Sequence, residues 1–488
     1  MKPEELLLKE RLQKLKKIIQ LGINPYPSKF DKKDEIKDIV LEFSKLKKEE
    51  KSRKNIKTAG RIMSLREMGK ASFFDMQDEK SKIQCYIREN ESKKNYELYQ
   101  LLDIGDIVSI EGTPFRTKRG ELSILVKNIN ILSKSLKPLP DKWHGIKDIE
   151  EKFRKRYLDL IMNPETKEMF VKKSKFWQAI RNFMLDKGFL EIETPVLENT
   201  TGGAAAAPFK THHNSLGIDV FLRISAGELW QKKLLVGGFE KIFEIGRIFR
   251  NEGVDTEHLQ DYTQMEFYWA YADYKNGMSL VQELYKKVAK EVLGTLKFKS
   301  HGFNLDFGGK WNIYDYEDLI KEKTGINIYK AEKKEVEKKL DQLNMEYDKK
   351  SDKWRLVDNL WKYCRKDLAG PGFLVNQPVE ISPLAKRNEK DKRKVDQFQV
   401  IIAGTELGNG YSELNDPSDQ EKRFLEQKKL KEAGDIEAHE FDESFVDALR
   451  YGMPPACGFG VSERFFAYLM DKPVRECVIF PLMKPENP

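Results

Sequence analysis

The chain has 488 residues, of which 34% are charged and 40% hydrophobic, and its formal net charge is +8. This balance is typical of a soluble globular protein with several domains. No apolar run approaches the roughly 20 residues that cross a bilayer, and the N-terminus lacks a signal-peptide pattern, which argues against membrane-spanning and secreted classes. The modest positive excess fits a polyanionic partner without requiring one.

Cysteine and histidine do not form a metal-binding pattern. The four cysteines make no C-x-x-C pair, and of six histidines only His212 and His213 are adjacent. We therefore expect free thiols in a reducing cytoplasm and no zinc site.

Residues 1–55 are predicted to form a charged helical extension. Four apolar residues recur at 4-3-4 spacing: Leu8, Leu12, Leu15 and Ile19. This spacing predicts one apolar face that docks on the next domain. The alternative is that a basic face of the same helix, formed by three lysines, contacts nucleic acid: Lys14, Lys16 and Lys17.

Residues 56–135 are predicted to form a small β domain. Five segments look like strands, with a short helix, 96–102, between the third and the fourth: 56–65, 71–77, 82–87, 107–116 and 121–132. This arrangement is typical of an OB-fold barrel, which binds single-stranded nucleic acid by stacking bases over a basic face. Phe73 and Phe74 fit such a face, although strand alternation alone would place one ring in the core and one outside.

Residues 136–150 are interpreted as a linker, since prolines stiffen its start, and residues 151–488 as one large domain. Within that domain, 172–187 is predicted to be an amphipathic helix, and 189–194 a strand stopped by Pro195. Another strand is expected over 400–407, and helical structure over 331–366.

Two segments of the large domain combine arginine with glutamate. The first reads as strand, polar loop and strand, and runs from Arg247 to Tyr268; the second, residues 458–464, reads as a glycine-rich turn that opens a helix carrying Arg464. Guanidinium groups grip phosphate oxygens and carboxylates hold Mg²⁺, so the pattern predicts a site for a polyphosphate with a metal. The chain has neither a P-loop nor a dinucleotide-binding glycine motif.

These two segments resemble motifs two and three of class II aminoacyl-tRNA synthetases. Residues 20–484 resemble the lysyl enzymes of the aspartyl, asparaginyl and lysyl subgroup, most closely at 408–416. The resemblance implies an α+β fold, in which an antiparallel-sheet catalytic domain follows an N-terminal OB-fold barrel. It also implies ATP-dependent activation of L-lysine to lysyl-adenylate and transfer to the 3′ end of tRNA(Lys), in a cytoplasmic homodimer that uses Mg²⁺.

The resemblance assigns an ATP site. Arg250 would hold the α-phosphate and Arg464 the γ-phosphate. Glu252 would lie beside adenine, His258 near the phosphates, and Tyr262 where the family usually stacks a phenylalanine on adenine.

A metal site is implied next to the phosphates. Glu406 would bind Mg²⁺ and act with the two arginines in catalysis. Gln399 stands where the family has a second metal-binding glutamate, and Glu413 is a further candidate ligand. An amide oxygen brings no charge, so we expect a weaker or rearranged metal site.

The lysine pocket implied by the resemblance has six members: Glu228, Glu266, Tyr268, Asn409, Tyr411 and Glu413. Glu228 and Glu413 would bind the ε-ammonium, Glu266 the α-amino group, and Asn409 the carboxylate. A buried ammonium needs paired carboxylates, and an apolar amino acid would leave them without partners.

In the barrel, four residues fall where the family contacts or approaches anticodon bases: Arg66, Phe73, Gln84 and Glu121. Residues 172–196 resemble motif one, which forms the dimer interface in the family, although Pro195 could equally be a strand terminator.

Besides Gln399, three departures from the family pattern affect the site. Ala207 replaces a usual basic residue, the segment 224–228 is one residue longer than usual, and 258–261 differs from the usual His-Asn-Pro-Glu. The longer segment makes the assignment of Glu228 less secure.

Three other functions share parts of this pattern. An aspartyl or asparaginyl enzyme would need a cation where Glu413 stands. The family's short relatives that lysylate a protein lack the anticodon domain. A non-catalytic RNA-binding paralogue is supported only by Gln399.

Overall fold

The computed structural model describes residues 3–140, 148–200, 202–204, 206–253, 255, 257–432 and 440–486. The chain divides into two compact units, Met1–Lys147 and Asp148–Pro488. Among the described residues, no helix is both long and apolar enough to cross a membrane. The expected α+β class is confirmed.

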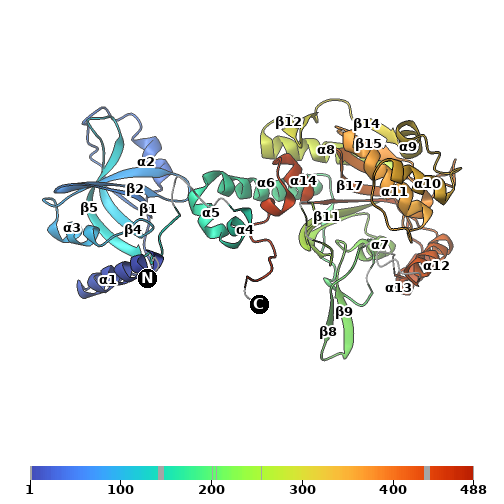
Figure 1. Ribbon diagram of the computed structural model, residues 1–488, viewed down its shortest axis with the longest axis horizontal. Coiled ribbons are helices and arrows are strands. Elements are labelled where there is room, and N and C mark those ends of the chain that lie inside the picture. The colour runs from blue at the N-terminus through green and yellow to red at the C-terminus, as the bar shows by residue number, and fades with distance from the viewer. Residues whose placement is uncertain are drawn as a thin grey trace. The chain divides into compact units, whose positions relative to one another are not determined.

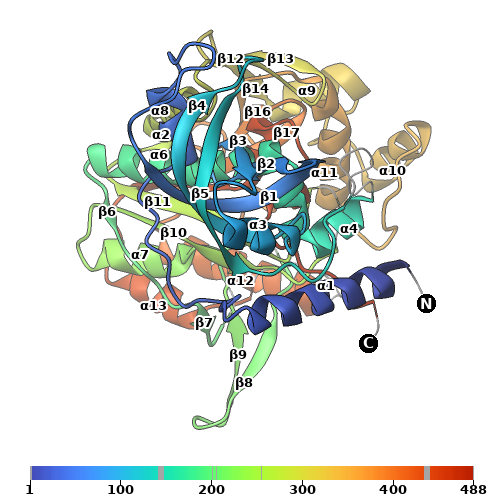
Figure 2. The same ribbon diagram turned by 90° about the vertical axis from the view of Figure 1, so that its left-hand side faces the viewer.

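The first unit is a closed five-stranded barrel in the order β1-β2-β3-β5-β4, visible in blue and cyan in Figures 1 and 2. Its elements are α1 (Pro3–Gln20), α2 (Ile36–Glu42), β1 (Ile56–Met68), β2 (Ala71–Gln77), β3 (Lys82–Arg88), α3 (Lys93–Gln100), β4 (Ile107–Arg116) and β5 (Leu122–Ser133). Inward side chains alternate with outward ones, so Phe74 is fully buried while its neighbour Phe73 is only half-buried.

The predicted apolar face of α1 is only partly correct. Leu8 and Leu15 are half-buried, but Leu12 and Ile19 are exposed, whereas Arg11 and Ile18 are buried. Arg11 donates hydrogen bonds to the carbonyl oxygens of Ile104, Ser135 and Lys137, at 3.1, 2.8 and 3.0 Å. Backbone carbonyl groups at the rim of the barrel need hydrogen-bond donors, and Arg11 supplies them, so a charged residue anchors α1. A search for apolar periodicity could not reveal this contact.

The second unit is built on an eight-stranded sheet of order β14-β15-β16-β17-β18-β11-β10-β6. Its strands are β6 (Leu190–Glu191), β10 (Lys241–Phe249), β11 (Asp261–Ala270), β14 (Asn312–Asp315), β15 (Gly372–Val375), β16 (Gln397–Ile402), β17 (Thr405–Ser412) and β18 (Ala456–Ser462). All neighbours pair antiparallel except β14 with β15 and β10 with β6.

Smaller sheets flank this one: β7 (Leu197–Glu198) pairs with β9 (Ile218–Leu222) and β9 with β8 (Lys210–His213), while β12 (Lys297–Ser300) pairs with β13 (Phe303–Asp306). The hairpin of β8 and β9 projects from the unit in both views (Figures 1 and 2).

The helices of the second unit are α4 (Ile149–Arg154), α5 (Arg156–Met162), α6 (Pro164–Asp186), α7 (Glu228–Val236), α8 (Tyr274–Leu293), α9 (Tyr316–Thr324), α10 (Lys333–Gln342), α11 (Lys353–Cys364), α12 (Pro417–Glu432), α13 (Glu443–Arg450) and α14 (Arg464–Leu469). Three short 3₁₀ turns are η1 (Arg365–Asp367), η2 (Val379–Ile381) and η3 (Val474–Cys477).

Alternation along the central strands separates a core face from a polar face. Helices α6 and α8 pack on the core face, where their apolar residues join Phe267, Phe398 and Phe459 in one buried cluster. Glu266 and Gly460, which neighbour two of these phenylalanines in sequence, point to the opposite face and line a pocket. This division follows the two-residue period of a strand.

Three predicted elements differ from the structure. The segment 400–407 is not one strand but the turn of a hairpin with the ends of its two strands. Ala403 and Gly404 both have positive φ, 48° and 72°, as a type I′ turn requires. Residues 458–462 lie in the strand β18 instead of a turn. Only residues 190–191 of the predicted strand 189–194 are paired, parallel to β10.

Candidate functional site

The polar face of the central sheet holds a pocket of about 350 Å³. Three central strands and the N-terminus of α7 supply its polar walls: Glu266 and Tyr268 from β11, Asn409 and Tyr411 from β17, Gly460 from β18, and Glu228 from α7. Arg250, Gln399 and Glu413 line it too. All six residues predicted for the amino-acid pocket therefore lie together.

The extra residue in the segment 224–228 does not displace Glu228. Gly227 precedes α7 with φ of 75°, and a side chain there would collide with the hydroxyl of Thr194. Only glycine fits this left-handed position, and Glu228 follows it as the first residue of the helix. The neighbouring Ala226 N–H donates to Glu266 Oε1 at 2.8 Å, which ties the segment to the pocket floor.

Three glutamates of the pocket are almost fully buried: Glu228, Glu266 and Glu413 are 6%, 4% and 1% exposed. Burial raises the pKa of Glu266 to about 7, and the charge of Glu228 adds to the effect. Burial likewise raises the pKa of Glu413 to about 8, against the opposing effect of Lys232. Such a cluster is costly unless cations occupy it.

Hydrogen bonds fix the orientation of two of these carboxylates. Glu266 accepts from Gln264 Nε2 at 2.7 Å and from the Tyr268 hydroxyl at 3.1 Å. Glu228 accepts from the Tyr411 hydroxyl. Tyr268 and Tyr411, predicted as pocket residues, thus hold the acidic groups as well as lining the cavity.

Lys232 of α7 was not predicted from the sequence. Its ammonium lies 2.7 Å from Glu228 Oε1 and 2.6 Å from Glu413 Oε2, and the side chain is 1% exposed. Burial opposes its charge, but Glu228 and Glu413 outweigh burial and raise the pKa of Lys232. The i,i+4 spacing from Glu228 is a signal that could have revealed half of this contact.

The two predicted phosphate-binding arginines lie on the same unit. Arg250 lines the pocket, donates to the carbonyl oxygen of Ile224 at 3.2 Å, and lies 5.8 Å from the centre of the Tyr262 ring. Arg464 starts α14 and pairs with Glu257 at 2.7 Å. Guanidinium groups held in this way are suited to phosphate oxygens.

The loop between β10 and β11 carries Glu252 and His258. Glu252 is half-buried, and exposed His258 contacts the Asp255 carboxylate at 2.7 Å. Val254 and Thr256, also in this predicted polar loop, lie outside the described residues. The two departures in this neighbourhood leave backbone contacts intact: Ala207 accepts from Asn251 N–H at 2.8 Å, and Gln260 from Arg250 N–H at 2.8 Å.

Two of the three predicted metal ligands meet at the hairpin of β16 and β17. Gln399 Nε2 lies 3.3 Å from Glu406 Oε2, and Glu406 also accepts from the Trp361 indole at 2.5 Å. Glu413 does not belong to this pair: seven residues separate it from Glu406 along an extended strand, on the order of 20 Å, and it contacts Lys232 instead. Among the described residues no group of three or more acidic, histidine or cysteine side chains could hold a metal.

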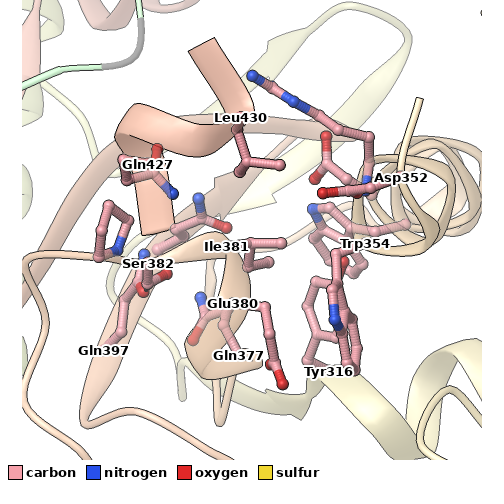
Figure 3. Close-up of a pocket in the computed structure, with 15 residues that line it drawn as sticks. Tyr316, Asp352, Trp354, Gln377, Glu380, Ile381, Ser382, Gln397, Gln427 and Leu430 are labelled. Carbon is pink, nitrogen blue, oxygen red and sulfur yellow. Dashed lines mark hydrogen bonds between the residues drawn. The ribbon is translucent and has the colours of Figure 1, made fainter. Parts of the chain in front are cut away.

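A second cavity, of about 180 Å³, adjoins the first and shares Gln399 and residues 381–383 and 397 with it. Figure 3 shows Asp352, Trp354 and Tyr316 on one side of it and Gln427, Ser382 and Gln397 on the other. It extends the polar cleft towards the helices α11 and α12.

On the barrel, Phe73 stacks on Tyr86 with ring centres 4.5 Å apart, and Tyr86 lies 6.0 Å from Phe115. The sequence predicted Phe73 but missed the other two rings, which alternation on β3 and β4 places on the same outer face. The other three residues predicted to contact the anticodon make bonds within the barrel. Arg66 pairs with Asp75 at 3.2 Å, and Gln84 accepts from Ser123 Oγ at 2.9 Å. Exposed Glu121 donates its backbone N–H to the Thr117 hydroxyl at 3.0 Å.

Comparison with known proteins places both units. Residues 148–484 match the family "tRNA synthetases class II (D, K and N)", and residues 56–132 match the "OB-fold nucleic acid binding domain". The chain is 44% identical to the lysine--tRNA ligase of Thermotoga maritima over 98% of its own length and 96% of that protein. It is also 44% identical to the lysine--tRNA ligases of Thermosipho africanus (98% and 95%) and Pelotomaculum thermopropionicum (99% and 95%). The chain therefore belongs to the class II tRNA synthetases of the D, K and N group and, within them, to the lysine--tRNA ligase family.

Proposed function

We propose that this protein activates L-lysine with ATP and transfers it to the 3′ end of tRNA(Lys). The observation that carries the proposal is the cluster of three buried glutamates, next to which the described residues place a single ammonium, that of Lys232. Buried carboxylates in excess of cations favour a ligand that brings ammonium groups. Aspartate and asparagine bring no side-chain cation, and Lys232 is already paired, so it offers them no free partner.

The proposed chemistry needs no general base. The lysine carboxylate is ionised at neutral pH, so it can attack the α-phosphorus of ATP directly; the new bond gives lysyl-adenylate and the bond to the leaving pyrophosphate breaks. Catalysis then depends on positioning and on stabilising charge at phosphate oxygens. We assign these tasks to Arg250 at the α-phosphate and Arg464 at the γ-phosphate. Glu252, His258 and Tyr262 would surround the rest of ATP.

We assign Mg²⁺ to Glu406 and Gln399. Mg²⁺ is commonly held by one or two carboxylates together with substrate phosphates. One carboxylate and one amide oxygen fit that pattern, since the two side chains lie in contact and Glu406 remains partly exposed. When bound, the ion would neutralise charge on the phosphate oxygens.

We further propose that the barrel binds the anticodon and that the enzyme works as a cytoplasmic homodimer. The half-buried rings of Phe73, Tyr86 and Phe115 support base stacking. Exposed apolar residues in and after α6 support a second copy of this chain as partner: Val171, Leu185, Leu190, Val196 and Leu197. Four free, buried cysteines suit a reducing compartment.

ATP–pyrophosphate exchange with each of the twenty amino acids, without tRNA, tests the activation step. Exchange with lysine alone is the expected result. Exchange with aspartate or asparagine would contradict the pocket assignment, and no exchange in folded protein supplied with Mg²⁺ would favour a non-catalytic protein.

A further inference from the structure

The pocket contains a lysine of its own behind the glutamates. Lys232 contacts Glu228 and Glu413 at 2.7 and 2.6 Å, and its ammonium lies within 6 Å of three ring centres: Tyr411 at 5.4 Å, Phe445 at 5.8 Å and Tyr268 at 5.9 Å. An ammonium enclosed by two carboxylates and aromatic rings is well satisfied without any ligand.

Lys232 does not line the pocket, although both of its glutamate partners do. It extends from α7 one turn after Glu228, and its ammonium also faces the ring of Phe445 on α13, which does not line the pocket. A ligand therefore meets the opposite side of the two carboxylates. Glu413 Oε1 has no hydrogen-bond partner among the described residues, and it lies against Gly458, which does line the pocket.

The charges of the pocket match those of free lysine. Ionised Glu228, Glu266 and Glu413 carry three negative charges, and Lys232 compensates one of them. The two that remain equal the two ammonium groups of lysine. Without Lys232, three carboxylates would face two cations, and like charges in a buried site suppress ionisation.

We propose that Lys232 is a positioning residue that sets the charge of the lysine pocket: it holds Glu228 and Glu413 in place and eases the ionisation of Glu413 when the ammonium groups of the ligand arrive. This inference rests on the proposed function and deepens it. The opposing influence of Lys232 on the raised pKa of Glu413 supports it.

The test compares Lys232→Met with Lys233→Met in pyrophosphate exchange. Lys233 is the matched control: it lies next on the same helix, and its ammonium contacts Ser444 Oγ at 2.8 Å and the Trp230 ring instead of the pocket glutamates. We expect Lys232→Met to raise the KM for lysine by about 10²-fold, because one partner of a buried charged cluster is lost. The KM for ATP should stay within about twofold, and Lys233→Met should resemble the wild type.

A pH profile distinguishes charge from packing. If Lys232 eases the ionisation of Glu413, the pH range over which the lysine KM falls should move upward by about one pH unit in Lys232→Met. A purely structural role would lower activity or stability without moving this profile.

A double-mutant cycle keeps the test decisive if Lys232→Met does not fold. Glu413→Gln removes one carboxylate that Lys232 neutralises, so adding Lys232→Met to it should cost less than about tenfold in lysine KM. The double variant should also be more stable than Lys232→Met, since it leaves one carboxylate, Glu228, without this cation where the single variant leaves two.

Two outcomes would overturn the role of Lys232: a folded Lys232→Met enzyme with the wild-type lysine KM and pH profile, or a folded double variant whose lysine KM lies more than about tenfold above that of Glu413→Gln. Wild-type enzyme is assayed first. If it shows no exchange with lysine, the proposed function itself fails, which is a separate result.

Discussion

Individual side chains of the pocket are predicted to make lysine binding depend on pH. Burial, and then neighbouring charge, raises the pKa of Glu266 to about 7, and burial raises that of Glu413 to about 8. Both groups thus hold protons near neutrality in the empty folded enzyme, which they would release when unfolded. The free energy of unfolding should therefore fall as pH rises from about 5 towards 8.

We expect the lysine KM to fall at least about tenfold between about pH 6 and pH 8, because bound ammonium groups favour the ionised carboxylates. Pyrophosphate exchange at saturating ATP measures this, with the ATP KM as the internal control. A lysine KM that is flat across this range would contradict the raised pKa values.

A second residue-level prediction concerns Gln399, whose amide lies 3.3 Å from Glu406. Gln399→Glu should lower the Mg²⁺ concentration needed for half-maximal exchange, by roughly threefold or more, because a second carboxylate strengthens an oxygen-ligand site. A Mg²⁺ titration of both enzymes decides the point, and identical titration curves would remove Gln399 from the metal site.

A site residue could be predicted from the sequence in two cases: when its contact partner is near in sequence, or when the family resemblance marks its position. The pocket glutamates were found because a known motif marks them. Lys232 was missed because the spacing relates it to Glu228 alone, whereas Glu413 lies far along the chain and meets it only in the fold. The pairing of a buried lysine with a distant glutamate depends on the tertiary fold, so no local sequence pattern predicts it.

At the level of elements, strand β18 shows why glycine was misread as a turn signal. Position 458 in this strand needs glycine, because a side chain there would collide with Glu413 Oε1 and come within 2.6 Å of the Tyr268 ring. At Gly460 the nearest atoms would be 3.1 and 3.2 Å away, on Gln264 and Glu266. These glycines are explained by neighbouring side chains that lie close to the strand backbone, not by a turn of the chain.

This difference gives a paired prediction. Gly458→Ala should raise the lysine KM by about 10- to 100-fold, since forced overpacking costs about 1–3 kcal/mol, whereas Gly460→Ala should cost less than about fivefold because its neighbours can shift slightly. Steady-state exchange kinetics on both variants provide the measurement. Equal effects would mean that contact with Glu413 is not the reason for glycine at 458.

The barrel strands allow a similar comparison between neighbours. Phe73→Ala should weaken tRNA charging by roughly 5- to 100-fold, because stacking contributes about 1–3 kcal/mol per base, and leave pyrophosphate exchange unchanged. Phe74→Ala, at a fully buried ring, should instead destabilise the barrel by about 3–5 kcal/mol. Aminoacylation, exchange and thermal melting of both variants separate the two roles; loss of exchange in Phe73→Ala would contradict a barrel-only function.

For the whole molecule, the chain's two units have separate hydrophobic clusters. The barrel strands were predicted closely, because each is local and alternating, whereas the order of the eight-stranded sheet was not, since it joins strands as distant as β11 and β18. Pairing between strands that are distant in sequence produces no periodic pattern of residues. The fold of the large unit was therefore predicted from the family resemblance and not from the residue pattern.

Separate cores predict separate responses to ligands. Lysine and ATP together, each at about 100 times its Kd, should stabilise the unit Asp148–Pro488 by several kcal/mol and raise its melting temperature by a few degrees, leaving the barrel transition in place. Phe74→Ala should do the reverse and lower only the barrel transition. Differential scanning calorimetry of the full chain records both. A single transition that moves as one under either change would show that the two cores unfold cooperatively, and the barrel would then have to be treated as part of the catalytic unit's stability.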